Sequence, residues 1–399
     1  MTSEALAPEF ALTAACCRWP ATADRDSAVQ ATAAGVRDWD EFLRLVRRQR
    51  VGGLAHEALS TAKIAPPSAV ARVLAARAKR SIGRNLLLAA ETVRLQGVLD
   101  AAGIATLVLK GVALSQLAYG SPTIKQTRDI DLLVPAERAE AALQILEREG
   151  YALRSPAHRL RATQRRALIR FGREVELVRR DGKLPVELEW RASDNPMLLR
   201  GVDAHSRAQT VTLPGGGSVR TLALDDLFAY LCVHGARHSW SRLKWLADVN
   251  ALLAANDADI GALYRHAQRI GAGLCAGQAL LLCRQLLALH LPAGLVDELS
   301  SDRRVEKLVA IALAAMCAPH ADMEADGGIA GVTRYMHTQF LLGRGWSFYA
   351  TQCRVASIAP VDVVRYPLPP FLQFLYPLLG LPLWLWRRMT AAREAGGRA

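Results

Sequence analysis

The chain has 399 residues, 51% of them hydrophobic, which is enough for two domains with a substantial core and excludes a disordered chain as its overall state. Its formal net charge of +13 favours acidic partners, namely nucleotides, phosphorylated substrates, RNA or an anionic membrane surface, and does not choose among them. The seven cysteines form no C-x-x-C pair, and the first residues lack the basic start and continuous apolar run of a secretory signal. We therefore expect a reduced, cytoplasmic protein without a zinc cluster.

Residues 1–103 have the pattern of a helical N-terminal region. Trp39–Arg48 predicts one helix, and Leu88, Leu95 and Leu99 recur at helical spacing in a longer one. Gly103 follows, and glycine is typical of the position just after a helix.

An α/β order begins at residue 104. Ile104–Leu109 is a short apolar segment that predicts a strand, and Lys110-Gly111 predicts a turn. Val112–Tyr119 then predicts a helix. Thr127–Val134 is β-prone, ends at Pro135 and predicts a second strand.

The next residues predict one more helix and two hairpins. Ala136–Glu149 has the apolar face of a helix, and Gly150 stands where a helix should stop. Asp181-Gly182 separates two strand-like segments, Arg173–Arg179 and Leu184–Trp190, which we expect to extend the same sheet. A second small hairpin is expected over Thr210–Leu222.

From Leu224 onward the apolar spacing predicts helices, with a loop at Met323–Gly331 and a frayed tail at Glu394–Ala399. The fold class is therefore α+β, a small mixed sheet flanked by helices with a C-terminal all-helical domain. The expected divisions are 1–103 (helical region), 104–222 (α/β core), 223–365 (helical domain) and 366–399 (apolar, proline-rich segment and tail).

Two acids in the second strand are the main indication of function. Asp129 and Asp131 are one residue apart, so both side chains project from the same face of a strand. Two close carboxylates repel each other and resist burial unless water or a cation, typically a hard metal ion, lies beside them. The alternative is a strand end with two solvated acids beside Arg128. We favour the metal-binding interpretation.

A third acid and a helix start complete the predicted site. The later strand offers Glu187 and Glu189 on one face; Glu187 is the candidate and Glu189 its nearest alternative, although a solvent-facing hairpin would show the same alternation. At the Lys110-Gly111 turn, backbone N–H groups that begin a helix could face a triphosphate, with Lys110 or Ser115 helping.

In their order along the chain, these features resemble the DNA polymerase β-like nucleotidyltransferase superfamily, in which a glycine turn precedes an Asp-x-Asp strand and a later strand with a third acid. More narrowly, the chain is similar to a bacterial nucleotidyltransferase family over most of residues 35–390. The segments that carry the similarity are 109–114 (LKGVAL), Tyr119, 128–134 (RDIDLLV), 186–190 (VELEW) and 234–248 (HGARHSWSRLKWLAD).

The resemblance implies that Asp129 and Asp131 bind Mg²⁺, expected as two ions, and that Glu187 completes the metal site and helps to deprotonate the acceptor. The expected contacts of the NTP substrate are Lys110, Gly111, Ser115 and Arg128. Two departures stand out. Val112 follows Gly111 where the superfamily usually has serine or glycine, and Glu189 stands where the family more often has histidine.

Residues 234–248 allow further functional interpretations. His234 and His238 lie one helical turn apart, but Gly235 replaces the glutamate of a His-Glu-x-x-His motif, which argues against a zinc hydrolase. A structural and a substrate-contacting role for these histidines both stay open. Trp240, Trp245 and Asp248 are expected to pin the helical domain onto the sheet, with base stacking by Trp240 as an alternative.

Two further segments carry alternatives. A predicted helix bears five arginines, which we interpret as a solvated face, with an anion-binding rim for an acceptor as the alternative: Arg159, Arg161, Arg165, Arg166 and Arg170. Tyr366–Trp386 has no charged residue and is long enough to span a bilayer, but five prolines should interrupt any regular helix there. We expect this segment to pack against the helical domain, with peripheral membrane contact through 366–388, or a span, as alternatives.

The leading hypothesis is a Mg²⁺-dependent enzyme that transfers a nucleoside monophosphate from an NTP to an acceptor hydroxyl and releases pyrophosphate. A small-molecule, peptide or protein acceptor is favoured over RNA. One alternative is a catalytically inactive binding module with the same fold, associated with the inner face of the membrane. Another is a template-independent RNA end-adding enzyme.

Overall fold

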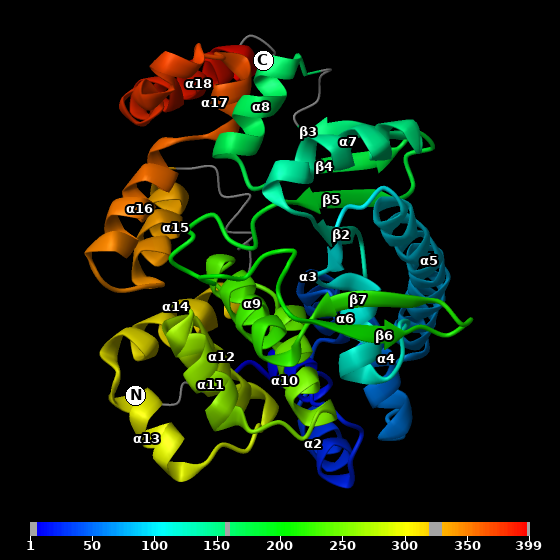
Figure 1. Ribbon diagram of the computed structural model, residues 1–399. Helices are drawn as coiled ribbons and strands as arrows, with labels where there is room; N and C mark the ends of the chain where they lie inside the picture. Colours follow the sequence, from blue (N-terminus) through cyan, green and yellow to red (C-terminus); the bar gives the residue numbers. More distant parts are fainter. Residues whose placement is uncertain (1–5, 156–159, 319–328, 397–399) are drawn as a thin grey trace.

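The computed structural model describes residues 6–155, 160–318 and 329–396. A small β-sheet lies between the long helix α5 and the C-terminal helices (Figure 1). The expected α+β class is confirmed.

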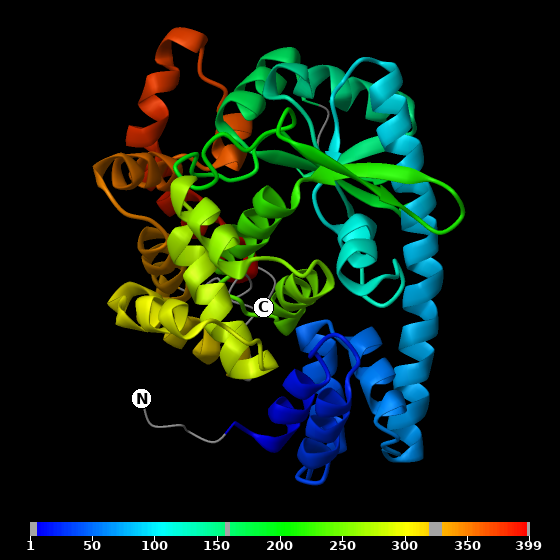
Figure 2. The ribbon, with the colours of Figure 1, turned by 60° about the horizontal axis from the view of Figure 1, so that its bottom comes forward.

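Helices fill the described part of the N-terminal region, as predicted. Helix α5 joins this region to the sheet, because Val70 and Leu74 pack among the N-terminal helices whereas Leu88, Leu95 and Leu99 pack against the sheet. Figure 2 shows α5 running along one side of the molecule between the two. The helices are α1 (Pro8–Ala15), α2 (Ala23–Ala33), α3 (Trp39–Gln49), α4 (Gly52–Thr61) and α5 (Ser68–Ala101).

The main sheet has five strands in the order β1-β2-β5-β4-β3. β2 and β5 are parallel, and the other neighbouring pairs are antiparallel. The predicted first strand is shorter than expected, since only two of its six residues pair. The strands are β1 (Leu107–Val108), β2 (Ile130–Leu133), β3 (Tyr151–Ser155), β4 (Glu174–Arg179) and β5 (Pro185–Glu189).

Helices cover one face of this sheet. Ile130 and Leu132 of β2 and Val186 and Leu188 of β5 belong to one apolar cluster, together with residues of α5 and of α7 (Ala139–Arg148). Residues that alternate with these point to the other face. That second face carries the acids. Helix α6 (Gly111–Tyr119), the 3₁₀ turn η1 (Ala136–Arg138) and helix α8 (Ala162–Phe171) complete the core.

The second hairpin forms as expected. β6 (Ala208–Thr212) and β7 (Ser218–Leu222) make a separate two-stranded sheet. Gly215 and Gly216 in its turn have φ values of +99° and +89°, a conformation that residues with a Cβ rarely adopt.

The rest of the described chain is mainly helical, and residues 224–287 pack closely on the edge of the core. Among the described residues, no helix combines the length and the apolar character that crossing a membrane requires. The helices are α9 (Leu224–Arg237), α10 (Leu243–Ala255), α11 (Ile260–Arg269), α12 (Gly273–Leu287), α13 (Ala293–Ser301), α14 (Arg303–Cys317), α15 (Ile329–Leu341), α16 (Trp346–Ser357), α17 (Pro360–Arg365), η2 (Pro370–Leu375, 3₁₀) and α18 (Tyr376–Gly396).

Three local predictions need correction. The expected loop at Met323–Gly331 was wrong for residues 329–331, which begin α15, and 323–328 lie outside the described residues. The expected tail was wrong for residues 394–396, which are helical in α18, and 397–399 lie outside the described residues. The prolines of 366–386 do not exclude a helix: Pro377 lies in the first turn of α18, where no N–H is needed, and Pro382 lies inside it.

Candidate active site

Strand register brings two of the predicted acids together. In the parallel pair of β2 and β5, Asp131 is the direct partner of Glu187, and Leu133 is the partner of Glu189. Because side chains alternate along each strand, these three acids share one face of the sheet.

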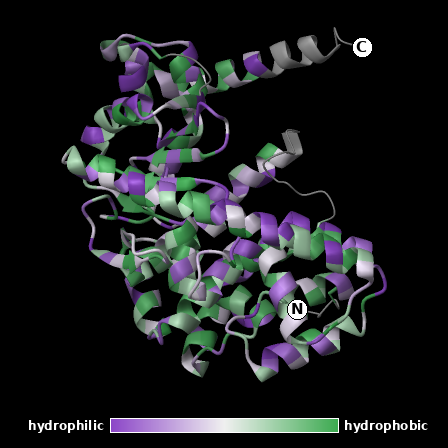
Figure 3. Ribbon diagram, turned by 90° about the vertical axis from the view of Figure 1, so that its right-hand side faces the viewer, coloured by the Kyte–Doolittle hydropathy of each residue, from purple (hydrophilic) through white to green (hydrophobic). Residues whose placement is uncertain are grey.

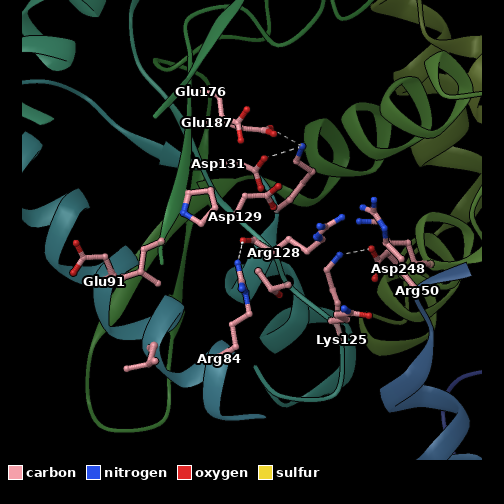
Figure 4. Close-up of a pocket in the computed structure, with 18 of the residues that line it drawn as sticks. Arg50, Arg84, Glu91, Lys125, Arg128, Asp129, Asp131, Glu176, Glu187 and Asp248 are labelled. Atoms are coloured by element: carbon pink, nitrogen blue, oxygen red, sulfur yellow. Dashed lines mark hydrogen bonds and ion pairs between the residues drawn. The ribbon is translucent and has the colours of Figure 1, made fainter. Parts of the chain in front are cut away.

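The carboxylates form a compact cluster. One oxygen from each of Asp131, Glu187 and Glu189 lies within 4.8 Å of the others, an arrangement that could hold a metal ion. The side chains of Asp131 and Glu189 are buried, and that of Glu187 is 28% exposed. Figure 4 shows Glu187 and Asp131 facing one cavity.

Lys110 supplies positive charge within the cluster. Its Nζ lies 2.9 Å from Oδ1 of Asp131 and 4.0 Å from an oxygen of each glutamate. Burial alone would lower the pKa of Lys110, but the negative charges around it, Asp131 first, hold it well above its usual value. Lys110 is therefore a permanent cation in this site.

One ammonium group does not neutralise three carboxylates. Burial, together with the charge of Asp131, raises the pKa of Glu187 to about 10. Burial would also raise the pKa of Asp131, but Lys110 outweighs it and keeps this carboxylate ionised. Without a further cation, Glu187 therefore holds a proton at neutral pH.

Glu189 has a partner of its own. Arg173, the residue before β4, donates to Oε2 of Glu189 at 2.7 Å and also pairs with Glu174. Burial still raises the pKa of Glu189 to about 7. The negative charge that this residue adds, compared with the histidine of the resembled pattern, is thus balanced by an arginine within the site.

Asp129 lies just before β2 and lines the same cavity as Asp131 and Glu187. It is half-buried, and burial together with the charge of Asp131 raises its pKa. Figure 4 shows it beside Asp131. Asp129 is outside the three-carboxylate cluster, so its role as a metal ligand stays a prediction.

The turn predicted at Lys110-Gly111 is present at the start of α6. Gly111 begins α6 with φ of +63°, and a Cβ there would lie 3.4 Å from Cγ2 of Thr127 and 3.5 Å from the backbone oxygen of Asp129. The turn thus brings the N-terminus of α6 against the segment that carries the acids. Lys110 and Gly111 both line the cavity.

The other two predicted phosphate contacts differ in their surroundings. Arg128 is exposed, lines the cavity, and accepts a hydrogen bond at its backbone oxygen from Arg84 of α5 at 2.7 Å. Ser115 is fully buried, does not line the cavity, and donates to the backbone oxygen of Ser121 at 2.7 Å. Its hydroxyl is therefore committed inside the core.

The cavity that contains these groups, which we call the carboxylate cavity, has a volume of about 1260 Å³. Its lining comes from α5, α6, β2, β3, β4, β5, α9 and α10 and from the segments beside them, and most of its charged residues are basic. They are Arg50, Lys79, Arg80, Arg84, Lys110, Lys125, Arg128, Arg154, Arg173, Arg179, Lys183, Arg237, Arg242 and Lys244. Basic side chains that surround a cluster of carboxylates suit a polyanion that carries metal ions.

A buried ion pair ties the helical domain to this site. Asp248 of α10 accepts from Nζ of Lys125 at 2.5 Å and from the hydroxyl of Tyr119 at 3.1 Å. The predicted pinning role of Asp248 has this physical basis. Its partner Lys125 was not expected from the sequence, because the two residues are 123 positions apart.

Lys244 is a second cavity residue without an assigned role in the sequence analysis. Burial, with the nearby charges of Lys125 and Arg50, lowers the pKa of Lys244 to about 7. Its ammonium group also lies 5.5 Å from the centroid of the Trp245 ring. This lysine changes its charge near neutral pH.

His234 lies in the last turn of α9, and His238 directly follows this helix. Their ring centroids are 4.8 Å apart, and the ring of His238 stacks on that of Trp245 with a centroid distance of 4.9 Å. Trp240 is fully buried, which excludes base stacking in this conformation. Its ring lies directly on Gly235, where a Cβ would come within 2.4 Å of the indole. Gly235 is therefore explained by packing.

A glycine turn, clustered acids on neighbouring central strands and a basic cavity define a nucleotidyl-transferring class of protein. The chain belongs to the family described as "Uncharacterised nucleotidyltransferase", whose model matches residues 36–288. The match ends with α12 and does not extend toward residue 390. No curated protein matches this chain. Its general activity is nucleotidyl transfer.

Proposed function

We propose that the protein transfers a nucleoside monophosphate from a Mg²⁺-bound NTP to an acceptor hydroxyl and releases pyrophosphate. The observation that carries this proposal is the convergence of Asp131 and Glu187 beside the N-terminus of α6, in one basic cavity.

The donor set fits a hard divalent cation. Carboxylate oxygens are the preferred ligands of Mg²⁺. Among the described residues, the buried Oε1 of Glu189 has no hydrogen-bond partner, and the one cation near Oδ1 of Asp131 is Lys110, at 2.9 Å, which also lies 4.0 Å from both glutamates. Asp131 and Glu187, with Asp129 at the cavity side, would hold the ion, and Glu189 would stay with Arg173. The bound ion would neutralise phosphate charge as the reaction proceeds.

The chain's own groups account for the remaining steps. The N–H groups of the first turn of α6 and the ammonium group of Lys244 would bind and orient the triphosphate. The acceptor oxygen forms a bond to the α-phosphorus while the bond from that phosphorus to the bridging oxygen of pyrophosphate breaks. Glu187, the most exposed of the three clustered carboxylates, would accept the hydroxyl proton once ionised.

Calorimetric titration with ATP, CTP, GTP and UTP in the presence of Mg²⁺ tests this proposal. At least one NTP should bind to the wild-type protein, and binding should require the divalent ion. The Asp131→Asn variant should lose the metal-dependent part. A folded wild-type sample that binds none of the four would refute the proposal. Incubation with α-labelled NTPs and host lysate would then identify the acceptor.

We also propose that the C-terminal segment contacts an anionic membrane surface. Six large apolar side chains there are about half to three-quarters exposed: Phe371, Phe374, Leu378, Leu381, Leu385 and Trp386. Figure 3 shows apolar residues in the part of α18 nearest the body of the molecule. Exposed apolar side chains that gather in one segment are a feature of interaction sites. No acid occurs between Val363 and Arg393, whereas arginines flank the segment.

Vesicle co-sedimentation tests this second proposal. The full chain should bind vesicles that contain anionic lipid more strongly than neutral vesicles. A triple variant, Phe371→Ser, Phe374→Ser and Leu378→Ser, should lose most of the binding. Equal sedimentation of this variant and the wild-type protein would refute membrane contact through these residues.

A further inference from the structure

A second cavity, of about 500 Å³, lies beside the first. Its lining comes from α8, the segment after β5, the end of α9, α15 and α16. Five arginines line it, Arg170, Arg173, Arg191, Arg237 and Arg354, and Asp194 is the one acid in its described lining. We call it the arginine cavity. Its volume is within the range of small-molecule sites.

Asp194 is already engaged by two of these arginines. It forms an ion pair with Arg237, and its Oδ1 lies 3.4 Å from Nε of Arg173. The pKa of Asp194 stays below its usual value because Arg237 and Arg173 outweigh the effect of burial. Its carboxylate is therefore already paired with two of the five arginines, and its charge only partly offsets the effects that lower the pKa of Arg191.

Those three have no carboxylate partner among the described residues. Arg170 donates to the side-chain oxygen of Gln373, and Arg191 donates to the backbone oxygens of Gly172 and Arg170. Burial, and then the positive charge of Arg354, lower the pKa of Arg191. An anion between these guanidinium groups would remove this repulsion.

A buried hydroxyl adds an independent indication of a ligand. Ser193 is 4% exposed and lines the arginine cavity, and its Oγ has no hydrogen-bond partner among the described residues. A buried polar atom normally has a partner, and leaving one unsatisfied costs about 1–3 kcal/mol.

The two cavities share two side chains. Arg173 and Arg237 line both, and Arg173 also binds Glu189 of the carboxylate cluster. A ligand held by Arg191 and Arg354 would thus lie next to the reaction site without occupying the NTP cavity.

We propose that the arginine cavity binds the phosphate group of a phosphorylated small molecule, and that this molecule is the acceptor. The assignment as acceptor rests on the proposed function. Phosphate is favoured because planar guanidinium groups bind it through paired hydrogen bonds.

Titration with inorganic phosphate at constant ionic strength tests the site. The pocket variant, Arg191→Gln with Arg354→Gln, should bind phosphate at least about tenfold more weakly than a charge-matched control, Arg148→Gln with Arg303→Gln. The control arginines are exposed and line neither cavity. Equal phosphate affinities in the two variants would overturn the proposal.

Two further measurements keep the outcome clear. Arg354 is exposed, so Arg354→Gln alone should fold even if loss of the Arg191 hydrogen bonds unfolds the double variant, and it should still weaken phosphate binding. Phosphate that binds in the carboxylate cavity is displaced by Mg²⁺ and NTP, whereas phosphate in the arginine cavity is retained. If no NTP binds but the pocket variant alone has a weakened affinity for phosphate, the proposed function is refuted and the proposed phosphate site stands. If NTP binds and the pocket variant keeps the phosphate affinity of the control, the proposed phosphate site is refuted and the proposed function stands.

Discussion

The ion pair between Lys125 and Asp248 should be a principal connection between the helical domain and the catalytic core. Both side chains are more than nine-tenths buried, and Asp248 also accepts from Tyr119. The Asp248→Asn substitution keeps the shape of the side chain but leaves the Lys125 ammonium group buried without a counter-charge. Loss of one partner of a buried pair costs about 3–5 kcal/mol, so we expect the free energy of unfolding to fall by that amount.

A double-mutant cycle measured by urea denaturation checks this magnitude. Lys125→Met should also destabilise, because it leaves Asp248 buried and unpaired. The double variant should be more stable than the sum of the two single losses implies, by about 2 kcal/mol or more. Circular dichroism and tryptophan fluorescence should report the same transition if unfolding is two-state. Single losses below about 1 kcal/mol that simply add would refute the reasoning.

Three more outcomes are expected. Glu187→Gln should weaken Mn²⁺ binding, followed by electron paramagnetic resonance, at least about tenfold, whereas Glu176→Gln on the neighbouring strand should change it little; equal losses would contradict the assigned ligand. Because the pKa of Lys244 is lowered to about 7, this lysine is charged below neutral pH, and NTP affinity should fall as the pH rises from 6 to 8. If the Lys244→Met variant shows the same fall in NTP affinity over this pH range, Lys244 is not its cause. Gly235→Ala would place a Cβ against the Trp240 ring and should lower the free energy of unfolding by about 1–3 kcal/mol, and an unchanged denaturation midpoint would argue against that contact.

The local pattern of the sequence was sufficient to find the parts of the site that depend on short-range geometry. Alternation along a strand predicted that Glu187 and Glu189 share a face, and Lys110-Gly111 predicted the start of α6. The choice between the glutamates depended on which residue of β5 lies beside Asp131. The register between β2 and β5, which are more than fifty residues apart, follows from packing of the whole core. The sequence alone therefore left the choice between Glu187 and Glu189 open.

Long-range contacts were the part that the sequence did not predict. Arg173, the residue before β4, pairs with Glu189 of β5, and Lys125 pairs with Asp248, which lies 123 positions away. Neither basic residue belongs to a motif. The helix through Pro382 was missed for a related reason, because contacts of α18 with α16 and α17 override the local cost of proline.

The most direct test of the account is the position of a divalent cation in crystals grown with Mn²⁺ and a non-hydrolysable NTP analogue. We predict an anomalous diffraction peak at the oxygens of Asp131 and Glu187, with the triphosphate extending toward the N-terminus of α6. A bound nucleotide whose cation lies away from both carboxylates would contradict the central claim.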